Sequence, residues 1–128
     1  MTSGDRPIEF LTVADLLEIA VGVIGEIELR DRGLLASAAA RPRSTVFGED
    51  AYPAFEDKAA ALMHSVARNH ALVDGNKQLA WAATRVFCLL NGRDLEYSVD
   101  EAEALVQAVA RGELDVAGIA ASIRRRLH

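Results

Sequence analysis

The chain has 128 residues, of which 51% are apolar and 26% are charged, and its formal net charge is −5. This length suits a single domain, residues 1–128, whose core buries roughly two thirds of the surface of the unfolded chain. The acidic balance argues against general nucleic-acid binding, which needs a basic surface. The one cysteine, Cys88, cannot form an internal disulfide or a cysteine-rich metal site.

No apolar run is long enough to span a membrane. The opening "MTSGDRPIEF" has no basic region followed by an apolar one, so it does not read as a secretory signal. We therefore expect a cytoplasmic protein that binds neither a membrane nor nucleic acid directly.

The first part of the chain is predicted to be helical. Thr12 can cap a helix from about Val13 to Ile24, whose apolar residues follow helical spacing, and "RDRG" is expected to end this region. The stretch "LLASAAA" predicts a second, short helix that stops before Pro42.

The middle of the chain predicts two strong helices with a polar interruption between them. Before them, "RPRSTVFGEDAYP" contains proline, glycine and a β-prone triplet, which predicts a loop or a short hairpin. A helix is expected from about Pro53 to His70, because apolar residues recur there at three- and four-residue steps. The stretch "ALVDGN" interrupts the pattern, and a second helix runs from about Asn76 to Asn91.

Two further helices are expected at the C-terminal end. Ser98 and Glu101 form the capping-box pattern at the start of a helix that runs to about Arg111. Asp115 can cap a last helix to Leu127. The predicted fold is therefore all-α, a compact bundle of about six helices with a short hairpin or loop.

The polar interruption gathers groups that suit an anion site. The first N–H groups of a helix lack intrahelical partners, and the helix dipole places partial positive charge there. Gly75 allows a ligand to approach the backbone closely, and Lys77 lies in the first turn of the second helix. Such an arrangement is a natural phosphate cradle, and Arg68 could reach the same anion from the end of the preceding helix.

His70 and Asp74 complete a set typical of phosphoryl transfer. A histidine can take a proton from an attacking hydroxyl, and an aspartate beside phosphates commonly holds Mg²⁺ or orients the nucleophile. The P-loop spacing GxxxxGK[ST] is absent.

Each residue alone also has a plain structural interpretation. His70 continues the apolar stripe of its helix, which is more often the position of a packed histidine. Asp74 is a typical turn and cap residue, and Lys77 is a typical solvated lysine. Trp81 and Cys88 are expected in the core. Only the combined pattern favours a site.

That pattern resembles the Fic/Doc family, whose motif runs H-x-F-x-[DE]-[GA]-N-[KG]-R. Here it reads "HALVDGNKQ". The lysine after the asparagine is similar to the death-on-curing (Doc) branch, whereas glycine there marks enzymes that transfer AMP. The likeness extends from "RDRGLL" to "CLLNGRDL", well over half of the chain.

The resemblance implies a role for each matching residue. His70 is the base that activates the target hydroxyl, and Asp74 is the essential acidic residue, which would also hold Mg²⁺. The residues that would hold the nucleotide are Arg68, Gly75, Asn76, Lys77 and Gln78. Enzymes of this branch transfer the γ-phosphate of ATP to a threonine of elongation factor Tu and so halt translation. The "STVFGED" segment would be the flap that positions the target beside the site.

Two positions depart from the motif. Leu72 replaces phenylalanine, and Gln78 replaces an arginine whose charge and bidentate fork it cannot supply. Loss of such a phosphate clamp would lower the rate by one to three orders of magnitude, roughly 1.5–4 kcal/mol. Gln78 therefore leaves open a degenerate, non-catalytic homologue that only binds an antitoxin. A nucleotidyltransferase that transfers AMP is the other alternative, which Trp81 disfavours because those enzymes carry a second arginine there.

The resemblance also implies control by a partner. The inhibitory pattern [ST]-x-x-x-E-[GN] of many Fic enzymes is missing, and its nearest match is "TVFGED". Doc-like toxins are held instead by an antitoxin whose C-terminal segment folds along a groove of the toxin. The alanine-rich faces "LLASAAA" and "AEALVQAVA" would suit such a groove, or they pack the protein's own helices together.

Overall fold

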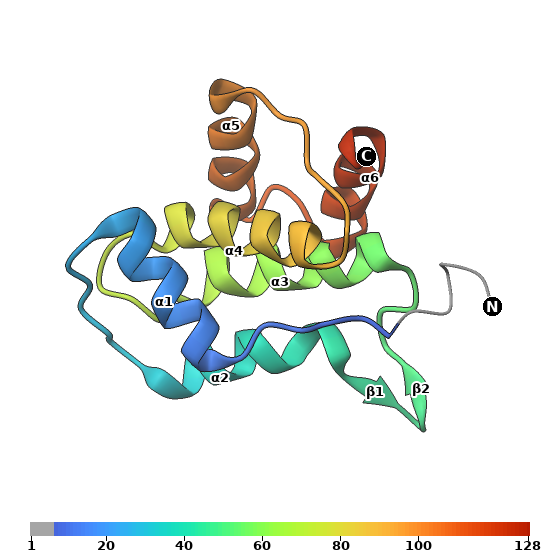
Figure 1. Ribbon diagram of the computed structural model, residues 1–128, viewed down its shortest axis with the longest axis horizontal. Coiled ribbons are helices and arrows are strands. Elements are labelled where there is room, and N and C mark those ends of the chain that lie inside the picture. Colours follow the sequence, from blue (N-terminus) through green and yellow to red (C-terminus); the bar gives the residue numbers. More distant parts are fainter. Residues whose placement is uncertain (1–6) are drawn as a thin grey trace.

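The computed structural model describes residues 7–128. Within them the chain forms six α-helices, one 3-10 helix and one two-stranded hairpin (Figure 1). In chain order the elements are α1 (Val13–Ile24), α2 (Arg32–Ala40), η2 (Arg41–Arg43), β1 (Thr45–Val46), β2 (Glu49–Asp50), α3 (Phe55–Asn69), α4 (Asn76–Leu90), α5 (Val99–Ala110) and α6 (Val116–Arg126). The prediction of an all-α bundle of about six helices with a short hairpin is confirmed.

Helices α3 and α4 form the centre of the bundle. They lie side by side, with α1 and α2 on one side and α5 and α6 on the other (Figure 1). Fully buried side chains from five helices fill the space between them; among them are Leu16, Leu35, Met63, Leu79, Phe87 and Ile123. Within residues 7–128, every helix is too short or too polar to cross a bilayer.

Local capping explains why most helix starts were predictable. Thr12 Oγ1 accepts the Asp15 N–H while the Asp15 carboxylate accepts the Thr12 N–H, which is a complete capping box. Ser98 and Glu101 form the same reciprocal pair at the start of α5. The Asp115 carboxylate accepts an N–H at the start of α6.

Two helix boundaries differ from the prediction. The segment "RDRG" does not end the first helix, because α1 already stops at Gly25, and Asp31 instead caps α2 by accepting the Leu34 N–H at 3.1 Å. Pro53 lies outside α3, whose N-cap is Ala54. Pro53 is therefore the residue before the N-cap. Its fixed φ and the restriction it places on Tyr52 hold the chain extended as it enters the helix.

Three apolar side chains near the ends of their helices differ in how far they are buried. Val23 and Leu90 share the apolar spacing of their helices, but they are 53% and 47% exposed, and each lies in the last turn of its helix. Cys88 is fully buried, as predicted, and burial raises the pKa of its thiol to about 12.

The hairpin forms, but far from the loop that joins α3 to α4. Thr45 pairs with Asp50, and the turn exposes Phe47 completely. The hairpin lies at the N-terminal end of α3, whereas His70 follows its C-terminal end (Figure 1). The 15 residues of α3 span roughly 22 Å at about 1.5 Å per residue. The expectation that this segment lies beside the site is therefore wrong for this structure.

A polar cluster fixes the base of the hairpin. Arg41 donates to the hydroxyl of Tyr52 at 2.8 Å and to Ser65 Oγ at 3.0 Å, and its Nη1 lies 2.8 Å from His64 Nδ1. Because arginine only donates hydrogen bonds, His64 Nδ1 must accept, which requires the neutral imidazole. Burial, with the positive charge of Arg41, lowers the pKa of His64.

Candidate active site

The loop begins with a reversal of the chain at His70. This residue ends α3 in the left-handed conformation, with φ 53° and ψ 47°, and its side chain is exposed. The interpretation of His70 as a histidine packed on the apolar stripe is therefore wrong. The reversal turns it out of the helix, where its imidazole is accessible to a substrate.

The segment before α2 is hydrogen-bonded to the first residues of the loop, which follow His70. Arg30 N–H donates to the Ala71 carbonyl at 2.8 Å, and Val73 N–H donates to the Glu28 carbonyl at 2.9 Å. The two strands of chain therefore run antiparallel for a few residues. This pairing joins parts of the sequence more than 40 positions apart, so no local pattern could predict it.

Asn76 closes the loop from the inside. Its Oδ1 accepts the Leu72 N–H at 3.0 Å, and its Nδ2 donates to the Leu72 carbonyl at 2.9 Å. The Leu72 side chain is 1% exposed, so leucine fills the core at the position where the motif has phenylalanine. The side chain of Asn76 is committed to this contact. Its backbone N–H, in the first turn of α4, is the group that could meet a phosphate.

Gly75 is required by its surroundings. Its φ of +92° lies in the region that favours glycine, and a Cβ there would come within 2.5 Å of Ile24 Cδ1. The adjacent Asp74 is exposed, and its Oδ1 accepts the Gly75 N–H at 3.0 Å. The Gly75 N–H thus holds Oδ1 of the Asp74 carboxylate in place, and Oδ2 does not take part in this hydrogen bond.

The N-terminus of α4 suits an anion. Gly75 is its N-cap and no side chain caps the helix, so the first N–H groups are not satisfied by a side chain. Lys77 and Gln78, in the same turn, are both exposed. A helix N-terminus beside a lysine attracts phosphate through directed N–H donors and positive charge.

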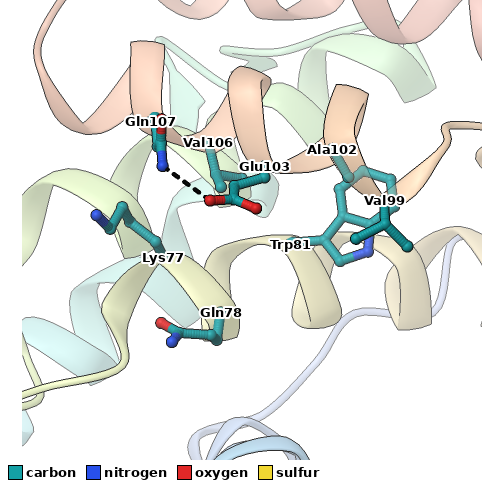
Figure 2. Close-up of a pocket in the computed structure, with 8 residues that line it drawn as sticks. All are labelled: Lys77, Gln78, Trp81, Val99, Ala102, Glu103, Val106 and Gln107. Carbon is teal, nitrogen blue, oxygen red and sulfur yellow. Dashed lines mark hydrogen bonds between the residues drawn. The ribbon is translucent and has the colours of Figure 1, made fainter.

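An open cavity of about 510 Å³ begins at this turn and runs between α4 and α5 (Figure 2). It is lined by Lys77, Gln78, Trp81, Val99, Ala102, Glu103, Val106 and Gln107. His70 and Asp74 are not part of its lining. This cavity therefore reaches only the lysine end of the motif, and a pocket that both His70 and Asp74 face stays a prediction.

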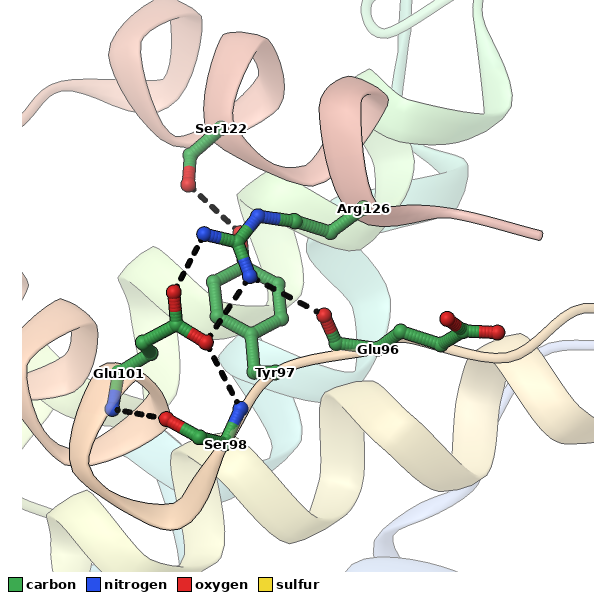
Figure 3. Close-up of polar contacts among 6 residues, drawn as sticks. All are labelled: Glu96, Tyr97, Ser98, Glu101, Ser122 and Arg126. Atoms are coloured by element: carbon green, nitrogen blue, oxygen red, sulfur yellow. Dashed lines mark hydrogen bonds and ion pairs between the residues drawn. The ribbon is translucent and has the colours of Figure 1, made fainter.

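Polar contacts next to this cavity join the start of α5 to α6 (Figure 3). Arg126 pairs with Glu101 and lies over the ring of Tyr97, whose hydroxyl is 2.6 Å from Ser122 Oγ. Tyr97 in turn meets Trp81 edge-on, with ring centroids 5.3 Å apart. The Arg126 guanidinium lowers the pKa of Glu101 to about 2. The start of α5 is thereby tied to the end of α6, and Trp81 is both a packing residue and a cavity wall.

Arg68 is directed toward α5 in this structure. Its Nη1 donates to the Ala110 carbonyl at 2.7 Å, and its guanidinium packs against Gly112. A contact from its other N–H groups to a nucleotide phosphate stays a prediction.

The residues present would suit Mg²⁺ bound jointly by the protein and substrate phosphates, rather than a metal bound by protein ligands alone. Residues 7–128 contain no group of three or more histidine, cysteine, aspartate or glutamate side chains placed to hold a metal ion. Mg²⁺ is usually bound by one or two carboxylates together with substrate phosphates and water. The exposed Asp74 beside the α4 N-terminus matches that pattern.

The motif loop and the helices on both sides of it match a known protein family. The sequence model of the Fic/DOC family matches residues 10–88, which include α1 to α3, the whole loop and most of α4. The chain belongs to the Fic/DOC family. It is also 52% identical over 120 residues to the protein named Toxin Doc from Mycolicibacterium smegmatis, covering 90% of this chain and 91% of that relative.

One residue of this Fic/DOC loop region received no role from the sequence. Arg30 lies in the stretch "RDRGLL", and its side chain donates to the carbonyls of His70 at 2.7 Å and Asn69 at 3.4 Å. The sequence offered only a charged residue beside a helix cap, which is an ordinary surface pattern.

Proposed function

We propose that the protein is the toxin of a toxin–antitoxin module and a Doc-type protein kinase. In this proposal it transfers the γ-phosphate of ATP to a threonine of elongation factor Tu in the cytoplasm, which stops translation. The observation that carries the proposal is the complete His70–Asp74–Lys77 set on a loop that opens onto an uncapped helix N-terminus. The similarity to Toxin Doc over 90% of the chain supports the biological role.

The proposed chemistry assigns one task to each group. The phosphates of ATP lie at the N-terminus of α4, against its backbone N–H groups and Lys77. His70 takes the proton of the threonine hydroxyl as that oxygen forms a bond to the γ-phosphorus. The bond between the γ-phosphorus and the bridging oxygen breaks, and ADP leaves. Asp74 would hold Mg²⁺, which when bound neutralises charge on the phosphates.

One experiment distinguishes the proposed kinase from two alternative functions. Transfer of AMP is the weaker enzymatic candidate, because Lys77 stands where AMP-transferring relatives have glycine and Trp81 stands where they have arginine. A non-catalytic protein that only binds its antitoxin is favoured by Gln78 alone. That side chain lies exposed at the cavity edge, so it holds no buried structure together.

For the antitoxin, the cavity between α4 and α5 is the better of the two alanine-rich candidates. Val99, Ala102 and Val106 give it an apolar wall, and it opens directly beside Lys77. A helical segment lying there would cover the phosphate end of the site. In α2, Ala38 and Ala39 are buried in the protein's own core; Ala102 and Val106 are buried as well, but they also line the open cavity beside Lys77.

The test of the reaction uses ATP labelled at either the γ- or the α-phosphate. Purified protein is incubated with elongation factor Tu and with cell extract, and His70→Ala serves as the control. We expect only the γ label to be transferred, and only by the unmodified protein. Transfer of the α label would replace the proposal with AMP transfer, and no transfer of either label would leave the binding-only protein.

The test of the biological role is growth. Expression of the protein alone should slow growth, and His70→Ala should remove the effect. Equal harm from both proteins would separate toxicity from this chemistry. Co-expression of the candidate antitoxin should restore growth and raise the thermal stability of the protein, because a ligand that binds only the folded state stabilises it.

A further inference from the structure

The conformation of His70 carries a cost that the surrounding structure must offset. A non-glycine residue is less stable in the left-handed region than in the right-handed one, because its Cβ comes too close to the following carbonyl oxygen. His70 has φ 53° and follows directly after the last residue of α3. This reversal is what brings the imidazole out of the helix and into the loop.

The end of α3 also leaves polar groups in need of partners. The last carbonyls of a helix have no intrahelical donor, and they carry the negative end of the helix dipole. Arg30 supplies donors and positive charge at this place. Its Nε donates to the His70 carbonyl at 2.7 Å, and its Nη2 donates to the Asn69 carbonyl at 3.4 Å.

The backbone of Arg30 reinforces the same contact. Its N–H donates to the Ala71 carbonyl at 2.8 Å, and the Asp31 N–H donates to the same oxygen at 3.0 Å. Three consecutive carbonyls, of residues 69, 70 and 71, are therefore bound by one short segment before α2. The peptide planes on both sides of His70 are fixed, and these planes set the direction in which its side chain leaves the backbone.

We propose that Arg30 is a positioning residue for His70: it holds residue 70 in the left-handed conformation from which the imidazole serves as the base. The catalytic part of this inference, that His70 serves as the base, rests on the proposed function. The conformational part concerns this chain alone and can be measured without any reaction.

The test compares Arg30→Met with Arg32→Met in the full chain. Methionine keeps a long apolar stem but removes every donor and the charge. Arg32 is an exposed neighbour, so its substitution removes the same charge close by without touching the loop. The first readout is the NMR coupling between the amide and α-protons of His70, which reports φ. The second is the rate of γ-phosphate transfer, separated into kcat and KM for ATP.

We expect Arg30→Met to shift the coupling of His70 away from its left-handed value and to lower kcat roughly 10- to 100-fold, the cost of a displaced catalytic group. The KM for ATP should stay within about 3-fold, because Lys77 and the α4 N-terminus are unchanged. Arg32→Met should match the unmodified protein in both readouts. Arg30→Lys, which keeps the charge and a donor, should recover part of kcat. Arg30→Gln, which removes the charge and the guanidinium, replaces Arg30→Met if that variant fails to fold.

The outcomes separate the two proposals. An unchanged His70 coupling and an unchanged kcat in Arg30→Met, or in Arg30→Gln where the methionine variant does not fold, overturn the positioning role and leave the proposed kinase intact. If the unmodified protein transfers no phosphate while the His70 coupling still shifts in Arg30→Met, the proposed function falls and the positioning role stands.

Discussion

The side-chain amide of Asn76 holds both backbone polar groups of Leu72, accepting its N–H at 3.0 Å and donating to its carbonyl at 2.9 Å. The loop that carries His70 and Asp74 is thereby closed on itself at the first residue of α4. Because Leu72 is buried, neither of its backbone groups can turn to water if this amide is lost.

We expect Asn76→Ala to lower the free energy of unfolding by about 1–3 kcal/mol, since it leaves two backbone groups unsatisfied. It should also abolish phosphate transfer. The matched control is Asn91→Ala, because Asn91 accepts the Glu9 N–H and donates to the Glu9 carbonyl, both at 2.9 Å, away from the loop. Denaturant unfolding should show losses in both variants, and transfer should fail only in Asn76→Ala. Equal activity in the two variants would mean that loop closure does not matter for the site.

Gly75→Ala should destabilise the protein for two separable reasons. A left-handed alanine costs about 1–2 kcal/mol, and its Cβ would meet Ile24 Cδ1 at 2.5 Å, which adds about 1–3 kcal/mol of overpacking. Gly92→Ala isolates the first cost, because Gly92 has φ +77° and a Cβ added there would meet nothing within 4 Å. The double variant Ile24→Val/Gly75→Ala removes Cδ1 and should recover part of the second. If it is no more stable than Gly75→Ala, the clash with Ile24 is not the cause.

Gln78→Arg should raise the transfer rate by one to three orders of magnitude if that position clamps phosphate. The side chain is exposed at the edge of the cavity, so an arginine fits there without disturbing the core. Gln107→Arg places the same charge on the opposite wall of the same cavity and should leave the rate nearly unchanged. Steady-state kinetics with ATP measure both. A rate that does not respond to Gln78→Arg would show that the phosphates are held without this position.

His64 should make folding sensitive to pH. Its pKa is lowered in the folded state by burial and by Arg41, from its ordinary value of 6.5. Above about pH 6.5 both states hold the neutral imidazole, and stability is at its full value. As the pH falls toward the lowered pKa, the unfolded state binds the proton first, so stability is lost.

The measurement is the free energy of unfolding at about pH 7.5 and at about pH 5.5. These two values lie on either side of the ordinary histidine pKa of about 6.5. His64→Gln should reduce the loss between the two conditions, since glutamine cannot be protonated. His128→Gln removes a second, exposed histidine, whose Nε2 lies 3.6 Å from a Glu96 carboxylate oxygen, and should keep the loss that His64 causes. An identical pH dependence in His64→Gln and the unmodified protein would show that His64 does not carry it.

The sequence by itself determined what depends on neighbours along the chain. The helix starts at Val13, Val99 and Val116 follow from caps that act across three residues, and the hairpin follows from its β-prone residues and glycine. The motif "HALVDGNKQ" indicated the family, because residue types and spacing alone define it.

Only the tertiary structure decided how these parts are used. It turned His70 out of α3, bound Arg30 to the end of that helix 40 residues away, directed Arg68 to α5, and placed the hairpin at the far end of α3. The physical reason is that each of these arrangements depends on contacts between segments distant in the sequence. Helical periodicity and capping are set within one or two turns, and they carry no information about which distant carbonyl an arginine will reach.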